Sequence, residues 1–138
     1  MHKFWLSVAG YFLATMAVAY PWHILLFHDQ YMAMGAFTRG EPIMPLGMAA
    51  VIVQGIVFAY FYPLFLAHKG GGSSLKRGIQ FSLLMGLTVY TVMVFATAAK
   101  FKIEPLSQFL FYGTAFQLLQ FVVVGVVLGW IHLERVQP

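Results

Sequence analysis

The residues best suited to chemistry in this sequence are histidines, methionines and an aspartate in one short segment. His23, His28 and Asp29 lie in AYPWHILLFHDQYMAM, which also contains Met32 and Met34. Imidazole and thioether groups are ligands for copper, so the segment predicts a copper site as one candidate. The two histidines are five positions apart, which places them on different helix faces unless the chain bends. The alternative is a group of polar residues at a membrane interface beside an aromatic anchor.

Other common kinds of catalysis find little support in the residue types. The chain has no cysteine, which excludes disulfides, thiolate metal sites and cysteine nucleophiles. Its serines have no neighbouring base and acid, and the glycines at 70–72 lack the GK[ST] sequence of a phosphate-binding loop. We therefore expect no enzyme, and no cofactor apart from the copper alternative.

A second set of polar side chains lies in the middle of apolar stretches. An amide alone in hydrocarbon is costly, whereas a hydrogen-bonded amide is not. We expect these side chains to form a polar layer between helices, because interhelical hydrogen bonds in membranes contribute roughly 0.6 to 2 kcal/mol each. A polar path for a solute is the alternative, but such paths usually carry ionisable groups. The predicted layer comprises Thr15, Gln54, Thr88, Thr91, Gln117 and Gln120.

Small residues four positions apart occur in each apolar stretch. Such pairs let the backbones of neighbouring helices approach closely, so they predict helix–helix contacts. The alternative is that glycine and alanine are simply common in membrane helices. The predicted packing pairs are Gly10 with Ala14, Gly55 with Ala59, Ser82 with Gly86, and Gly125 with Gly129.

Composition indicates the elements that must position these residues. The chain has 138 residues, of which 61% are hydrophobic and 9% charged, and its mean hydropathy is +0.81. Soluble proteins carry about 25% charged residues, so a chain this poor in charge faces lipid. Apolar stretches at about 4–27, 43–66, 77–99 and 105–131 each exceed the roughly 20 residues that cross a membrane as a helix. We predict an all-α integral membrane four-helix bundle, formed by one domain covering residues 1–138.

Two parts of the sequence resemble each other. EPIMPLGMAAVIVQ begins at Glu41 and ends at Gln54, and EPLSQFLFYGTAFQ begins at Glu104 and ends at Gln117. The equal spacing is compatible with two duplicated helical hairpins. Chance similarity between apolar segments is the alternative.

The charged residues lie between the apolar stretches and predict an orientation. One side would hold Lys3, Lys69, Lys76, Arg77 and Arg135, and the other Arg39, Lys100 and Lys102. The positive-inside rule then predicts that both termini lie in the cytoplasm. The long break at 28–41 is expected to form an ordered cap on the outer side. With no basic soluble face, the chain is not expected to bind nucleic acid.

The segments YPWH, RGEPIMPLGM, FAYFYP, RGIQFSLLMG and TAFQLLQF give the chain a resemblance to small bacterial four-helix integral membrane proteins of unknown function. The resemblance covers about the whole chain and implies an inner-membrane four-helix protein without transferable catalytic residues. From the residues themselves we expect a non-enzymatic structural or accessory subunit of a membrane complex. It would contact lipids and pack against other subunits or copies of itself. A small transporter or channel, and a copper-binding accessory protein, are the alternatives.

Overall fold

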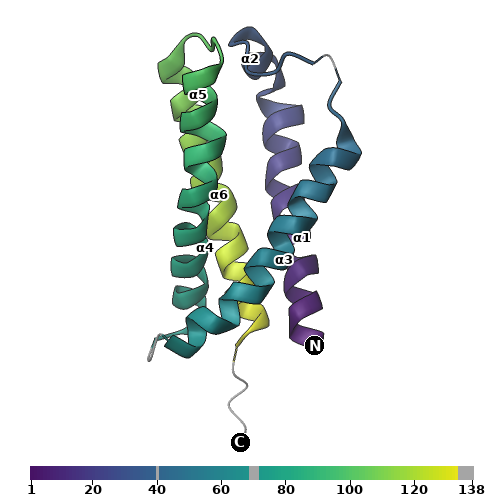
Figure 1. Ribbon diagram of the computed structural model, residues 1–138, viewed down its shortest axis with the longest axis vertical. Coiled ribbons are helices and arrows are strands. Elements are labelled where there is room, and N and C mark those ends of the chain that lie inside the picture. The colour runs from purple at the N-terminus through teal and green to yellow at the C-terminus, as the bar shows by residue number, and fades with distance from the viewer. Residues whose placement is uncertain (40, 69–71, 134–138) are drawn as a thin grey trace, which may run out of the picture.

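The computed structural model describes residues 1–39, 41–68 and 72–133, and within these residues it contains helices and no strands (Figure 1). The all-α prediction is therefore confirmed. A short π-helical segment continues two of the helices: η1 follows α1, and η2 follows α4. The elements are α1 (His2–Tyr20), η1 (Pro21–Leu26), α2 (His28–Ala33), α3 (Met44–His68), α4 (Ser74–Tyr90), η2 (Thr91–Ala96), α5 (Thr97–Lys100) and α6 (Leu106–Ile131).

Four continuous helical rods are long and apolar enough to cross a membrane. They cover His2–Leu26, Met44–His68, Ser74–Lys100 and Leu106–Ile131, with lengths of 25 to 27 residues. At 1.5 Å per residue each rod spans about 40 Å, more than the roughly 30 Å of a hydrocarbon core. These rods support a transmembrane protein, as the composition predicted. The third rod begins before the predicted residue 77 because the Ser73 side chain caps it by accepting from the Lys76 amide at 3.3 Å.

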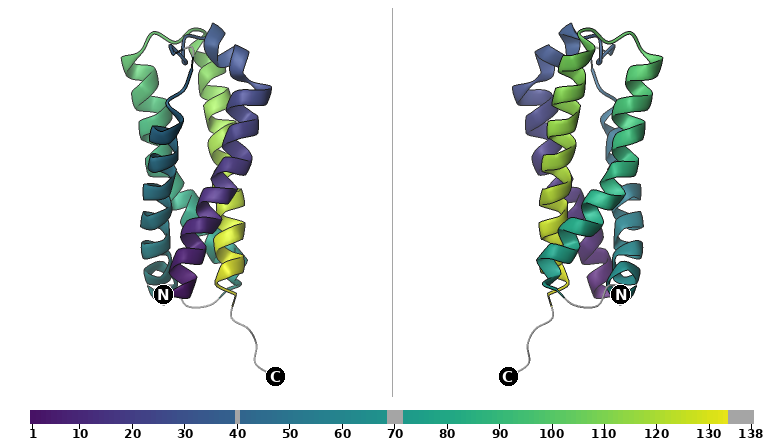
Figure 2. Two further views of the ribbon diagram at one scale, coloured as in Figure 1. Left: turned by 90° about the vertical axis from the view of Figure 1, so that its right-hand side faces the viewer. Right: turned by 90° about the vertical axis from the view of Figure 1, so that its left-hand side faces the viewer.

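Helix α6 is the central element of the bundle. It packs along α4 on one side and α1 on the other, while α3 crosses α1 diagonally and meets α4 near the start of that helix (Figures 1 and 2). The main core lies where these helices converge, and a second cluster lies beneath α2. The buried side chains of the main core include Tyr11, Phe58, Tyr62, Phe81, Phe121, Val124 and Leu128, and those of the second cluster are Tyr31, Met34, Val94, Ile103 and Phe109.

The two ends of the bundle differ in construction. At the terminal end, which comprises residues 1–7, 66–68, 72–77 and 129–133, α1 begins beside the end of α6 (Figure 1). At the opposite cap end, α2 and the segment after it fold over the helices, and the Glu104 amide donates to the Met34 carbonyl at 3.0 Å. The described part of 28–41 thus forms the expected ordered cap. Lys69 and Arg135, which the orientation argument used, lie outside the described residues.

Candidate functional site

A buried tyrosine is the centre of the polar layer. Tyr11 on α1 is fully buried, and its hydroxyl donates to Oε1 of Gln54 on α3 at 2.8 Å. Thr15, one turn along α1, and Gln120 of α6 lie next to the same hydroxyl. One phenol group therefore connects three of the four rods at the level of the predicted layer.

Several buried polar atoms of α1, α4 and α6 are unpaired among the described residues. Within the described residues, Oγ1 of Thr15, Oε1 of Gln117 and Oγ of Ser82 have no hydrogen-bond partner. Each unpaired group in a buried position costs roughly 1 to 3 kcal/mol. This cost offsets much of what the hydrogen bonds contribute, so the layer fixes the relative positions of the helices more than it raises stability.

Thr88 and Thr91 do not join the polar layer, so this part of the prediction is wrong. Both side chains are exposed on the outside of the third rod. The Thr88 hydroxyl donates to the Met85 carbonyl at 2.6 Å, and the Thr91 hydroxyl donates to the Thr88 carbonyl at 2.8 Å. A threonine can satisfy its hydroxyl within its own helix and needs no partner helix in lipid. The third rod instead contributes Tyr90, whose hydroxyl lies 2.8 Å from Oγ1 of Thr114 on α6.

The glycines of α4 and α6 bring these two helices into backbone contact. A Cβ added at Gly125 would lie 2.5 Å from Cα of Ile79, and one at Gly129 would lie 2.7 Å from the Ser74 carbonyl oxygen. Gly78, which the sequence analysis did not select, packs directly against the backbone of both glycines. Gly78 precedes the predicted Ser82 by four residues, so the same spacing rule could have identified it.

The other predicted small residues also lie at contacts between helices. Ala14, Ala59 and Ser82 are buried, and the neighbours of each glycine come from a different helix. A Cβ at Gly10 would meet side chains of α6, one at Gly55 would meet Val8 and Tyr11 of α1, and one at Gly86 would meet the ring of Phe121 on α6. The predicted small-residue faces are therefore used inside the chain, between its own helices.

A hydrogen-bonded histidine closes the terminal end of the bundle. Nε2 of His132 lies 3.0 Å from Oγ of Ser7, which donates its own proton to the Lys3 carbonyl at 2.8 Å. Nε2 of His132 is therefore the donor in this pair. The ring of Tyr62 packs edge-on against the imidazole. Burial, with a smaller contribution from the Lys3 charge, lowers the pKa of His132 below its usual value.

His23 lies in an aromatic environment. Its ring centroid is 4.4 Å from that of Phe116 and 5.0 Å from that of Tyr31. Its Nδ1 is buried and has no hydrogen-bond partner within the described residues. In the described part of the chain, the ring contacts of His23 are with aromatic side chains, and no other candidate copper ligand is among them.

The remaining candidate copper ligands differ in burial and in their neighbours. His28 Nδ1 lies 3.5 Å from the exposed Asp29 carboxylate. Met34 is buried under the cap, whereas the Met32 side chain is exposed. Across residues 1–39, 41–68 and 72–133 there is no group of three or more histidine, cysteine or acidic side chains placed to hold a metal ion. The copper site stays a prediction without geometric support.

Comparisons of the chain with protein-family models, curated proteins and solved structures gave no match. The resemblance to small bacterial four-helix membrane proteins therefore stays a prediction, as do the proposed duplication and the transporter alternative. The arrangement of the residues themselves is the basis for a functional proposal.

Proposed function

We propose that the protein is a non-enzymatic accessory subunit of a membrane protein complex, and that it docks through residues 44–50 at the start of α3. The observation that carries this proposal is the exposure of residues 41–50, every one of which is exposed. Gly47 has no atom within 4 Å of the position a Cβ would take, whereas glycines elsewhere in the long helices touch a neighbouring helix. Among the described residues, this segment is therefore exposed on every side of the helix.

The residue types in this docking segment, 44–50, suit a protein partner. Gly47, Ala49 and Ala50 are small and allow another helix to approach closely. Met44 and Met48 are exposed and have flexible thioether side chains that adapt to irregular surfaces. A segment that faced only acyl chains would have no need of so many small side chains.

The rest of the bundle is suited to serve as a rigid support. Its glycine contacts and the Tyr11–Gln54 hydrogen bond join the helices to one another. Because these groups are engaged inside the chain, they are not the docking surface that the small-residue and glutamine faces were expected to provide. An accessory subunit needs a stable shape and an exposed surface for its partner. The joined helices and the exposed segment 44–50 therefore support the proposed role.

We further propose a bacterial inner-membrane location with cytoplasmic termini, on the basis of the positive-inside rule. The sequence places five Lys and Arg residues on the side of the termini and three on the other; the described residues alone hold three on each side. Alkaline phosphatase fused after residue 138 should be inactive, whereas a fusion after Arg39 should be active. The reverse pattern would contradict this orientation.

The docking proposal is tested by native electrophoresis of membranes solubilised in mild detergent. The wild-type chain should migrate in a complex well above its own 15.5 kDa, with a partner in fixed proportion. Ala50→Leu should reduce the complex about tenfold, because added side-chain bulk prevents close helix approach. Ala99→Leu adds the same bulk at an exposed position of α5 and should leave the complex intact. A wild-type chain migrating alone, or an intact complex in Ala50→Leu, would refute the proposal.

A further inference from the structure

The face of α3 that contacts α1 continues into the docking segment. Gln54 and Phe58 of α3 both contact Tyr11 of α1, through the hydrogen bond at 2.8 Å and through rings whose centroids are 4.7 Å apart. At about 100° per residue, Gly47 and Ala50 lie within an arc of about 80° that also holds these two residues. Gly47 and Ala50 are exposed, because α3 diverges from α1 at its start (Figure 1). Another helix can therefore take, at the docking segment, the place that α1 takes further along α3.

One cation and one anion flank the docking segment at the cap end. Arg39 and Glu41 are both exposed, and neither forms an ion pair with another of the described residues. They come shortly before Met44, with which α3 begins, so they lie beside the docking segment at the membrane surface. A partner that packs on this segment therefore meets charges of both signs.

A second copy of the chain carries the matching charges at the same depth. Copies of one chain insert with the same orientation, so their docking segments lie at one level in the bilayer. A two-fold axis along the membrane normal makes the contact isologous, and Arg39 of each copy can then face Glu41 of the other. Exposed ion pairs contribute little affinity, but like charges across an interface exclude a partner. The charges thus select the partner, while Gly47 and Ala50 let the two helices approach closely.

We propose that the docking segments of two copies pack against each other, so that the protein forms a parallel homodimer. This inference rests on the proposed accessory function and names the partner that covers the docking segment. The homodimer is then the form in which the protein joins its complex. The accessory function itself requires only that some membrane protein covers residues 44–50, so the identity of the chain found there separates the two proposals.

The first test produces two versions of the full-length chain together, each with a different affinity tag. One version is purified from membranes solubilised in mild detergent, and the recovery of the other is measured. The wild type should recover the wild type. Arg39→Glu in both versions should reduce recovery about tenfold because four carboxylates then meet, and Glu41→Arg in both should do the same with four cations. Lys100→Glu changes the charge at an exposed position of α5 and should leave recovery unchanged.

The decisive combination mixes the two charge variants. An Arg39→Glu copy carries two carboxylates at these positions and a Glu41→Arg copy carries two cations, so the two should recover each other as well as the wild type recovers itself. Variants that had failed to fold could not give this rescue. Failure of the mixed pair to recover would overturn the proposal.

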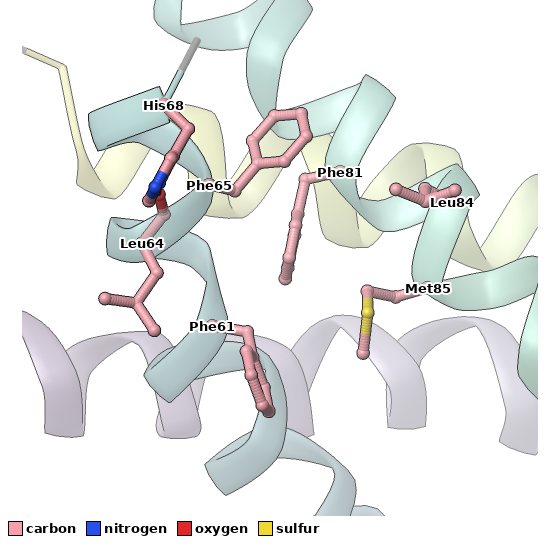
Figure 3. Close-up of a pocket in the computed structure, with 7 residues that line it drawn as sticks. All are labelled: Phe61, Leu64, Phe65, His68, Phe81, Leu84 and Met85. Atoms are coloured by element: carbon pink, nitrogen blue, oxygen red, sulfur yellow. The ribbon is translucent and has the colours of Figure 1, made fainter.

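A cysteine at the docking segment tests the contact itself. Oxidation of membranes that contain Gly47→Cys should link two chains into a product of twice 15.5 kDa, because the native chain has no other thiol. The control is Leu84→Cys, an exposed position that lines an apolar cleft between α4 and the end of α3 (Figure 3). It should give no such product.

The outcomes separate this inference from the accessory function. Equal dimer at both cysteines, or none with Gly47→Cys, would overturn the homodimer. A wild-type complex that contains a different protein and no second copy would also overturn the homodimer, yet it would leave the accessory function standing. A chain that migrates alone would refute both.

Discussion

The Tyr11 hydroxyl carries more of the bundle's specificity than any single glutamine. It donates to Gln54 and lies beside Thr15 and Gln120, so one polar group sets the contact between α1, α3 and α6. Moving any of these helices by one residue would leave a buried phenol without its acceptor. The penalty for such unpaired groups makes other helix registers unfavourable.

Tyr11→Phe should lower the free energy of unfolding in detergent by about 1 kcal/mol, the usual contribution of an interhelical hydrogen bond. Tyr60→Phe makes the same chemical change on the exposed face of α3 and should have no measurable effect. Thermal unfolding of both variants checks this. A double-mutant cycle with Gln54→Leu should give a coupling of about the same size. An additive cycle would show that the hydrogen bond contributes nothing.

His132 should make stability depend on pH. Because its folded pKa is lowered, the unfolded chain binds a proton first as pH falls below about 6.5. The free energy of unfolding should therefore keep its full value with respect to His132 above that pH. It should decrease as the pH falls from there toward the lower pKa of the folded state. His132→Gln can keep a hydrogen bond to Ser7 and should reduce the slope measured by thermal unfolding from pH 8 to pH 4.5. An identical slope in the variant would rule out this role for His132.

Among single residues, the sequence predicted the glutamines of the polar layer but not Tyr11, the hydrogen-bond donor at its centre. A carboxamide is costly when it faces hydrocarbon, so the buried positions of Gln117 and Gln120 follow from physical chemistry, although Oε1 of Gln117 has no hydrogen-bond partner within the described residues. Tyrosine is also common at membrane interfaces, so its type alone did not identify Tyr11 as the centre. Ser7, Tyr11 and Thr15 are four residues apart along one face, and that spacing was the available signal. Thr88 and Thr91 did not indicate a contact between helices, because a threonine hydroxyl can hydrogen-bond to a carbonyl of its own helix.

The contact between α4 and α6 is the closest approach between helices. Gly78 lies against the backbone of Gly125 and Gly129, so no side chain separates the two helices there. This contact stabilises the helix pair through close backbone approach and the dispersion interactions that it allows. These are main sources of helix association when lipid surrounds the protein. The two backbones can touch only where the residues that face the other helix have small side chains.

The same substitution should therefore have opposite effects at two glycines. Gly47→Ala should stabilise the isolated protein by about 0.5 to 1 kcal/mol, because alanine favours helix and its Cβ meets nothing. Gly125→Ala should destabilise it by about 1 to 3 kcal/mol, because its Cβ would lie 2.5 Å from Cα of Ile79. Thermal unfolding in detergent measures both. Stabilisation by Gly125→Ala would mean that the helices separate easily at this contact.

At the element scale, hydropathy and length sufficed to predict four helices and most of their ends. They could not predict which helix would be central, because all four spans are similarly apolar. The glycine spacing did indicate that α6 packs closely, yet it could not say that α4 was the partner. Pairing depends on shape complementarity between faces, which a single sequence does not display.

The whole molecule combines a closely packed part with a divergent helix. Helix α6 packs along α4 and α1, and α3 packs against α1 but diverges from it at its start, where residues 44–50 are exposed (Figure 1). The exposed segment at residues 44–50 is the surface that we propose for a protein partner.

The most direct test of the accessory role is site-specific cross-linking in native membranes, which the absence of cysteine makes simple. Met48→Cys places one thiol on the docking segment, and Leu87→Cys places one on the exposed face of α4. Each variant is labelled with a maleimide photo-cross-linker and irradiated. We predict one adduct of defined mass for Met48→Cys, made with another protein, and none for Leu87→Cys. Adducts only to lipid at both positions, or equal protein adducts at both, would contradict the account.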